Sequence, residues 1–202
     1  MPEAVVLAGG RSTRFGEGDK AVADLAGTPA IRRVADRLAG PVDRLVVNCR
    51  ADQVEPITDA LSGYPLPVTV AEDETPDAGP MAGIRDGLRA VDSAYALVVA
   101  CDMPFVDPAL VEYLFDRAEG RDGAVPRLSD GWFQTTQAVY RADRMADACA
   151  AALARDDGRI VAALSDLDYA VVEEAEVREH AAVESFENLN TREEFEAAAD
   201  RL

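Results

Sequence analysis

The segment LAGGRSTRFGEGDK, residues 7–20, gathers the residue types that bind phosphate. Two consecutive glycines, Gly9 and Gly10, let the backbone approach a ligand closely and offer N–H groups to an anion. Arg14, Lys20 and a further arginine place positive charge in this segment of a chain whose net charge is −18. A local positive field in so acidic a chain predicts an anionic ligand. The alternative is an ordinary glycine turn whose arginines are solvated.

Lys20 is the single lysine in a chain with 20 Lys and Arg residues in total. Lysine carries a compact charge on a flexible stem, whereas arginine presents a planar fork. We therefore predict that Lys20 has a role that arginine does not fill. The segment is neither a Walker A motif nor a GxGxxG dinucleotide fingerprint, because the required spacings are missing. It is interpreted as a phosphate-binding loop of a third type, distinct from both of these motifs.

Three polar residues fall at or just after the ends of predicted strands: Asn48, Asp73 and Asp102. Asp102 follows YALVVA, residues 95–100, an apolar run typical of a central parallel strand. Because ligands of open α/β sheets bind beyond the carboxyl ends of the strands, we expect these residues to meet the glycine loop at one edge. A carboxylate there favours Mg²⁺, which prefers oxygen ligands and bridges carboxylates to phosphates. A helix-capping or turn aspartate is the alternative for Asp102.

The elements that must position these residues alternate along the chain at the spacing of βαβ units. This pattern predicts one α/β domain, residues 1–202, in three layers: a doubly wound, mostly parallel sheet with helices on both faces. Thr28 is expected to cap the first helix, with Pro29 in its first turn. Strands are expected at 3–7, 44–48, 66–71, 95–100, 123–126, 134–140 and 169–172. Helices are expected at 29–38, 54–61, 79–91, 108–118, 144–154, 159–164 and from 191.

Composition excludes several classes of protein. No apolar run approaches the roughly 20 residues of a membrane span, and MPEAVV has no basic region of a secretion signal. Cys49, Cys101 and Cys149 lack CxxC pairing, which argues against disulfides and zinc and predicts a reducing cytoplasm. Cys101 is interpreted as a small buried residue rather than a nucleophile. The single histidine, His180, excludes a multi-histidine metal site and is expected at the surface.

The acidic excess, 38 Asp and Glu against 20 Lys and Arg, disfavours nucleic acid and anionic membranes as partners. The acids are spread along the chain, and we interpret them as a halophilic adaptation to a salt-rich cytoplasm. Concentrated ions screen the self-repulsion of such a charge. We expect the midpoint of thermal unfolding to rise from low to multimolar KCl. Equal stability across that range would contradict this interpretation.

Five segments in order resemble the molybdenum cofactor guanylyltransferases, within the nucleotidyltransferases of the nucleotide-diphospho-sugar type. They are LAGGRSTRFGEGDK, Glu72-Asp73, GPMAG at 79–83, CDMP at 101–104 and NLNT at 188–191. The glycine loop by itself indicates only the superfamily. The segments GPMAG, CDMP and NLNT together narrow the resemblance to the molybdopterin branch and its close relatives. The resemblance implies a Rossmann-like sheet and Mg²⁺-dependent transfer of GMP from GTP to molybdopterin, releasing pyrophosphate. It also implies transient contacts with molybdenum-cofactor-handling proteins.

The resemblance assigns roles to residues of the loop by position. The backbone of Leu7, Ala8 and Gly9 would contact the nucleotide, and Arg14 and Lys20 would hold its phosphates during catalysis. Such a reaction fits the residues present, because phosphoryl-type transfer depends on positioning and neutralised charge rather than on a nucleophile–base pair.

Further positions match residues that lie beyond the loop. Asn48 and Asp73 match nucleotide-binding positions, and Asp102 matches the catalytic residue that binds both nucleotide and Mg²⁺. Asn188 and Asn190 match a motif near the same site.

The acceptor side departs from the family pattern. Gln134–Gln137 reads QTTQ where many relatives carry His-Pro, so the identity of the acceptor stays open. Molybdopterin cytidylyltransfer, cobinamide-phosphate guanylyltransfer and transfer to a sugar phosphate are alternatives, although GPMAG argues against the cobinamide branch. A non-catalytic nucleotide-binding module is a further alternative on this fold. Asn48 and Asp73 by themselves do not choose between guanine and cytosine.

Overall fold

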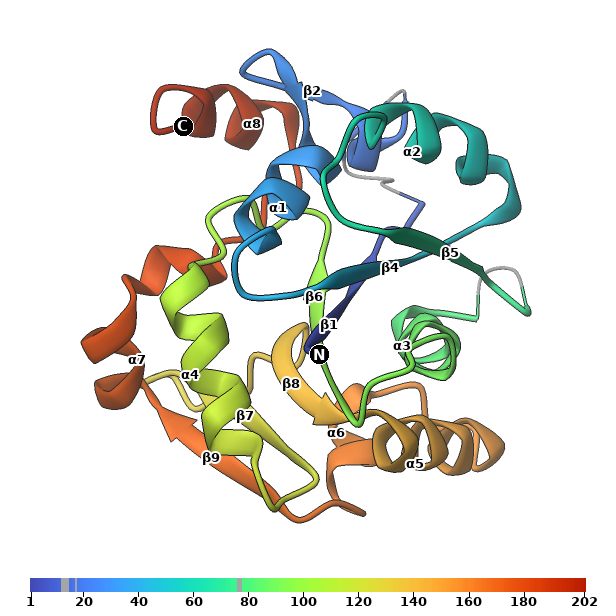
Figure 1. The fold of residues 1–202 in the computed structure, drawn as a ribbon, viewed down its shortest axis with the longest axis vertical. Coiled ribbons are helices and arrows are strands. Elements are labelled where there is room, and N and C mark those ends of the chain that lie inside the picture. Colours follow the sequence, from blue (N-terminus) through green and yellow to red (C-terminus); the bar gives the residue numbers. More distant parts are fainter. Residues whose placement is uncertain (12–14, 17, 76–77) are drawn as a thin grey trace.

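A computed structural model describes residues 1–11, 15–16, 18–75 and 78–202. Its centre is a seven-stranded sheet in the order β5-β4-β1-β6-β8-β7-β9 (Figure 1). Within this described sheet, β8 is antiparallel to both of its neighbours, and the other pairs are parallel. The strands are β1 (Glu3–Leu7), β4 (Arg44–Cys49), β5 (Val68–Glu72), β6 (Tyr95–Ala100), β7 (Gly123–Arg127), β8 (Gln137–Arg141) and β9 (Tyr169–Glu173).

The order of the strands reverses between β1 and β6. From β1 the chain moves outward to β4 and β5, and it then returns to β6 on the other side of β1. The register pairs Val5 with Val46 on one side and with Val98 on the other. In open α/β sheets this switch in strand order is where ligands bind, at the carboxyl ends of the strands.

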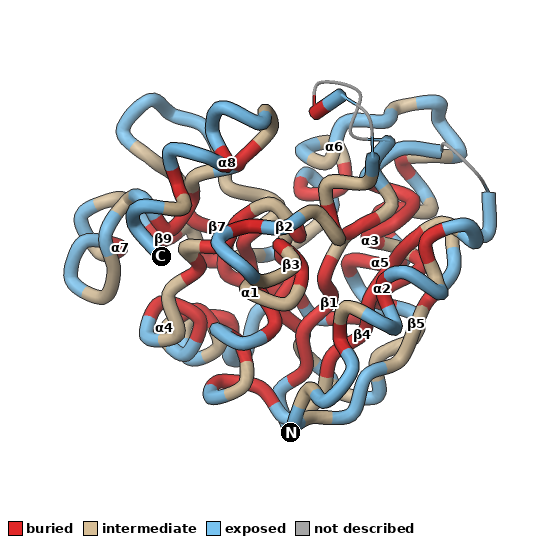
Figure 2. The backbone as a smooth tube through the Cα atoms, turned by 90° about the horizontal axis from the view of Figure 1, so that it is seen from above, coloured by how far each residue is buried: buried red, intermediate tan, exposed pale blue. Residues whose placement is uncertain are grey.

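Helices cover both faces of the sheet and complete the predicted three layers. One face packs against α1 (Ala30–Leu38), α2 (Val54–Ala60), α4 (Pro108–Ala118) and α7 (Glu174–His180). The other packs against α3 (Pro80–Arg89), α5 (Ala142–Ala154) and α6 (Ile160–Leu164). Successive strand residues supply the two cores in turn, since strand side chains alternate between faces. The inner strands β1, β4 and β6 are accordingly buried at the centre of the molecule, whereas the edge strand β5 is partly exposed (Figure 2).

Local sequence signals set the starts of several helices. The side chain of Asp107 accepts a hydrogen bond of 2.9 Å from Ala109 N, which caps α4 ahead of its first residue Pro108. Gly79 precedes α3 with a φ of +85°, a conformation that favours glycine. At α8 (Arg192–Ala199), Thr191 and Glu194 form a capping box. The predicted starts of α3, α4 and α8 are confirmed.

The predicted cap of the first helix is wrong. Thr28 and Pro29 form the short strand β3, which pairs with β2 (Asp24–Leu25) in a hairpin, and α1 begins one residue later without a side-chain cap. Ala26 and Gly27 both have positive φ, which suits a tight hairpin turn. Because of this turn, Thr28 pairs with Leu25 in the hairpin and does not cap the helix.

Two further differences concern the second half of the chain. The strand expected from Gln134 begins only at Gln137, because Gln137 N donates to Gln134 O in a turn. The short helix α7 was not predicted, and its start is fixed by a capping box between Glu173 and Glu176.

His180, at the end of α7, is half-buried and stacks on Tyr113 with ring centroids 3.9 Å apart. Across the described ranges, no helix has the length and apolarity to cross a membrane.

Candidate active site

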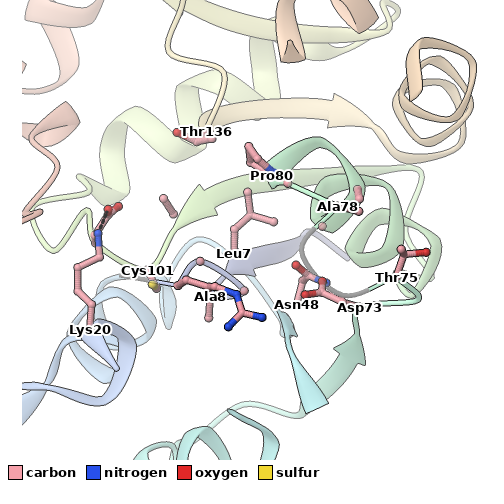
Figure 3. Close-up of a pocket in the computed structure, with 18 residues that line it drawn as sticks. Leu7, Ala8, Lys20, Asn48, Asp73, Thr75, Ala78, Pro80, Cys101 and Thr136 are labelled. Atoms are coloured by element: carbon pink, nitrogen blue, oxygen red, sulfur yellow. Dashed lines mark hydrogen bonds and ion pairs between the residues drawn. The ribbon is translucent and has the colours of Figure 1, made fainter. Parts of the chain in front are cut away.

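A cavity of about 360 Å³ opens at the carboxyl edge of the sheet, at the switch between β1 and β6. Its walls come from the ends of β1, β4 and β6, the residues just after β5, the glycine loop and the start of α3 (Figure 3). The predicted site residues that line it are Leu7, Ala8, Gly9, Gly10, Lys20, Asn48, Asp73 and Asp102. The structure therefore brings together most of the residues predicted from distant parts of the sequence. Arg14 lies outside the described residues, so its role stays a prediction.

Lys20 and Asp102 meet in this cavity as an ion pair. Lys20 Nζ lies 2.5 Å from Asp102 Oδ2, and the two side chains are only 13% and 14% exposed. Lys20 begins a short 3₁₀ helix, Lys20–Val22, whose start is capped by Asp19. The second carboxylate oxygen, Asp102 Oδ1, is buried and has no hydrogen-bond partner among the described residues. This oxygen is a ready acceptor for a metal ion or a donor group of a ligand.

The backbone around Asp102 is held from two sides. Cys101 N donates to Leu7 O at 3.0 Å, which continues the pairing of β6 with β1. Leu189 N donates to Asp102 O at 2.9 Å, which ties the turn to the C-terminal part of the chain. The carboxylate of Asp102 is therefore presented from a fixed backbone, as a site that binds a cation requires.

Asn48 and Asp73 form a second polar pair on the opposite wall. The buried amide of Asn48 donates to Asp73 Oδ1 at 2.9 Å and to Ala71 O at 3.1 Å. Both amide hydrogens of Asn48 are thus donated to protein acceptors. The other carboxylate oxygen of Asp73, Oδ2, takes no part in the hydrogen bond with Asn48. A Cβ on Gly83 of α3 would lie 2.3 Å from Asn48 Oδ1, so glycine is needed there. Asn48 is placed to orient Asp73 toward the cavity.

Sequence reasoning missed two residues that hold the glycine loop. Arg50 Nη1 donates to Gly9 O at 2.9 Å and to Gly10 O at 2.8 Å. The buried Gln53 donates to Ala8 O at 2.8 Å. These bonds fix the peptide groups of the loop at the cavity wall. No periodicity or motif could have identified them, because they depend on the packing of a turn after β4 against a loop after β1.

Arg50 holds the carbonyl groups of Gly9 and Gly10, so its loss should displace the loop. Arg50→Ala should raise the KM for the nucleotide about tenfold, because misplacing a binding loop by a fraction of an ångström weakens every contact it makes. Arg32→Ala is the matched control: Arg32 also pairs with an aspartate and donates to a carbonyl, that of Ser62. Steady-state kinetics with both variants would check this. Equal effects on KM would contradict the role of Arg50.

The two asparagines of the NLNT motif have different surroundings. Asn190 Oδ1 accepts a hydrogen bond of 3.3 Å from Lys20 Nζ, so this residue reaches the site through the lysine. Asn188 is exposed, its amide donates to Phe186 O in its own segment, and it does not line the cavity. The structure thus joins Asn190, but not Asn188, to the cluster of predicted site residues.

The QTTQ segment contributes one residue to the cavity. Thr136 lines it, and its carbonyl accepts from Ala100 N at 3.1 Å (Figure 3). Gln137 is fully buried and donates to Ser185 Oγ at 2.8 Å, away from the cavity. Thr136 therefore marks the wall opposite the Asn48–Asp73 pair.

Cys101 also lines the cavity, but its thiol is poorly suited to nucleophilic chemistry. Burial and then the neighbouring Asp102 carboxylate raise its pKa well above the ordinary value. Because a raised thiol pKa keeps the group protonated at neutral pH, the reactive thiolate is nearly absent there. The expectation that Cys101 is a small buried residue is confirmed.

Cys101→Ala should keep kcat within about threefold of wild type, since an unreactive thiol contributes no covalent step. Cys149→Ala is the control, because Cys149 is also buried, with a pKa raised to about 12, but lies outside the cavity. A thiol reagent at pH 8 should label all three cysteines slowly until the protein is unfolded. Rapid labelling of Cys101 in the folded protein would contradict the assignment.

The fold and the site define an α/β nucleotidyltransferase: a glycine loop after β1 at the switch point, with a lysine and a carboxylate placed for phosphate and cation. Comparison with known proteins agrees, since residues 4–174 match the MobA-like NTP transferase domain. The chain belongs to the MobA-like NTP transferase family, and it is an enzyme of the nucleotidyltransferase class.

Similar proteins share nearly the whole length of the chain. A probable molybdenum cofactor guanylyltransferase of Natronomonas pharaonis is 53% identical over 198 residues, covering 98% of this chain and 96% of the relative. One of Haloferax mediterranei is 39% identical, covering 98% and 92%. Among solved structures, the molybdopterin-guanine dinucleotide biosynthesis protein A of Archaeoglobus fulgidus superposes with a TM-score of 0.80 at 26% identity, covering 100% and 98% of the two chains.

Proposed function

We propose that this chain transfers GMP from GTP to the phosphate of molybdopterin, forming the guanine dinucleotide cofactor and releasing pyrophosphate. The observation that carries the proposal is the Lys20–Asp102 pair beside the glycine loop, in the cavity at the sheet's switch point. The names of the similar proteins supply the donor and the acceptor.

The proposed reaction needs charge neutralisation and alignment more than covalent help. An oxygen of the acceptor phosphate forms a bond to the α-phosphorus of GTP, and the bond from that phosphorus to the bridging oxygen breaks. Pyrophosphate leaves with the electron pair. Lys20 would hold the ionised phosphates, and the N–H groups of Gly9 and Gly10 would face them. No proton has to be removed from the nucleophile, because the acceptor phosphate is already ionised.

The residues of the site fit a Mg²⁺ ion. Asp102 Oδ1 is a buried oxygen without a hydrogen-bond partner in the described part of the chain, and hard cations prefer oxygen. Within those same ranges no three His, Cys, Asp or Glu side chains form a metal cage. Asp102 would therefore share the ion with substrate phosphates, as Mg²⁺ sites in phosphoryl transfer commonly do. When bound, the ion would neutralise charge on the triphosphate and on the leaving pyrophosphate.

Two further walls of the cavity are assigned to the acceptor and to the nucleobase. We assign Thr136 to the acceptor side, where the QTTQ segment departs from the family pattern. Asp73, oriented by Asn48, is assigned to the nucleotide. A carboxylate can accept hydrogen bonds from the adjacent N1–H and N2–H₂ donors of guanine, whereas cytosine offers only its amino group as a donor there. Transient contacts with molybdenum-cofactor-handling proteins belong to the same proposal.

A direct assay tests the proposed function. Purified protein in high KCl with Mg²⁺ is offered GTP, CTP or ATP together with molybdopterin, and pyrophosphate release and the mass of the product are measured. GTP should support release only when molybdopterin is present. Release with CTP but not GTP would replace the proposal by cytidylyltransfer, and a lack of release with all three would refute it.

A further inference from the structure

The C-terminal segment, residues 188–199, builds a small third core against the chain that follows the glycine loop. Leu189, Phe195 and Ala198 of this segment are buried together with Phe15, Leu25 and Ala30. This cluster is separate from the cores on the two faces of the sheet. In Figure 1, α8 accordingly lies beside the β2 hairpin rather than on the sheet. The segment therefore packs chiefly against the region of the loop and its hairpin.

The contact with the glycine loop is made through Phe15. The rings of Phe15 and Phe195 meet edge to face, with centroids 4.7 Å apart and an angle of 61° between their planes. The guanidinium carbon of Arg192 lies 5.1 Å from the centre of the Phe15 ring. Phe15 and Phe195 are each only 5% exposed. Such a pair stabilises beyond the burial of its area, because the ring quadrupoles are complementary.

The same segment also reaches the two charged residues of the site. Asn190 Oδ1 accepts from Lys20 Nζ, and Leu189 N donates to Asp102 O. The capping box of Thr191 and Glu194 fixes the turn between these contacts and α8. One short segment thus contacts the loop at Phe15, the lysine at its end and the turn that carries Asp102. It lies beyond residue 174, where the match to the family domain ends.

We propose that Phe195 is a positioning residue. By packing on Phe15, it keeps Lys20 in place beside Asp102. This inference rests on the proposed function for its kinetic consequence, but its structural consequence can be measured without any activity. The segment that follows the matched domain then belongs to the working enzyme rather than being an accessory tail.

The chain offers a matched control for Phe195. Phe186 is equally buried, with 5% of its surface exposed, but it packs in the core of the sheet rather than against the loop. Phe186→Ala and Phe195→Ala remove the same atoms from equally buried positions. Both should lower global stability, and only Phe195→Ala should loosen the region around Lys20.

A lysine-specific protease reports on this region directly. Because Lys20 is the only lysine, such a protease cuts the native chain at one peptide bond. After correction for global stability measured by denaturant unfolding, Phe195→Ala should be cut about tenfold faster than wild type, because local opening is no longer opposed by the aromatic pair. Phe186→Ala should be cut at the rate its stability alone dictates. Equal corrected rates for the two variants would overturn the proposal.

Kinetics and a conservative variant complete the test. Phe195→Ala should raise the KM for GTP about tenfold with a smaller change in kcat, and Phe195→Leu, which restores most of the buried volume, should recover at least half of both effects on a logarithmic scale. If Phe195→Ala does not fold, Phe195→Leu is compared with the wild-type protein, and the same differences are expected at smaller amplitude.

Protection of Lys20 from the protease by GTP and Mg²⁺ is measured in parallel in the wild-type protein. Lack of protection would count against the proposed function, whereas the cleavage ratio of the two variants would still decide the role of Phe195.

Discussion

Replacing Lys20 with alanine should lower kcat for pyrophosphate release at least about tenfold, the scale of one lost charge contact in a transition state. The lysine lies beside Asp102 in a cavity that the glycine loop lines. In the proposed reaction its ammonium group would stabilise the leaving pyrophosphate. Arginine is not expected to restore the rate fully, because its planar fork does not fit the space of a single Nζ. Steady-state kinetics at saturating Mg²⁺ would measure both variants.

Arg121→Ala is the control for the lost charge. It removes one positive charge from an exposed pair with Asp168, outside the cavity. Exposed pairs contribute little, so this variant should retain wild-type turnover. If Lys20→Ala also retained near-normal turnover, the role given to the lysine would be refuted.

Asp102→Asn should lower activity about a hundredfold and weaken the dependence on Mg²⁺ in parallel. The substitution keeps the shape of the side chain but removes the charge, and it replaces one carboxylate oxygen by an amide group. It also removes the ion pair between Asp102 and the largely buried Lys20. Pyrophosphate release measured across a Mg²⁺ titration should show at least a tenfold rise in the concentration for half-maximal rate.

The matched control is Asp168→Asn, which changes the same charge on the other side of the exposed pair with Arg121. Its Mg²⁺ titration should superimpose on that of the wild-type protein. A titration of Asp102→Asn that also superimposes would remove Asp102 from the metal site.

These two predictions are linked by the ion pair itself. A largely buried carboxylate requires a compensating charge, and Lys20 provides it in the structure. In the proposed reaction, Asp102 would hold the cation and Lys20 the phosphates. The C-terminal segment contacts both residues, Lys20 through Asn190 and Asp102 through Leu189.

Much of the fold could be predicted because its signals are local. The run YALVVA predicts a strand buried on both faces, and it forms β6, which is paired on both sides. Helices were expected from residues 108 and 191, and they begin near these residues because the side chains of Asp107 and Thr191 cap backbone N–H groups two or three residues away. The hairpin at Thr28 was mistaken for a cap because the same residue types suit both, and only the positive φ values of Ala26 and Gly27 decide between them.

The sequence alone predicted the glycine loop, the approximate bounds of the strands of the main sheet and the polar residues at their ends, since parallel strands bring their carboxyl ends to one edge whatever their spacing in the chain. How those residues are held depends on the tertiary structure. Arg50 and Gln53 donate hydrogen bonds to carbonyl groups of the loop. Asn48 orients Asp73. Phe195, near the end of the sequence, packs on Phe15. Contacts of this kind depend on side-chain packing between loops and termini, which has no period and leaves no pattern in the sequence.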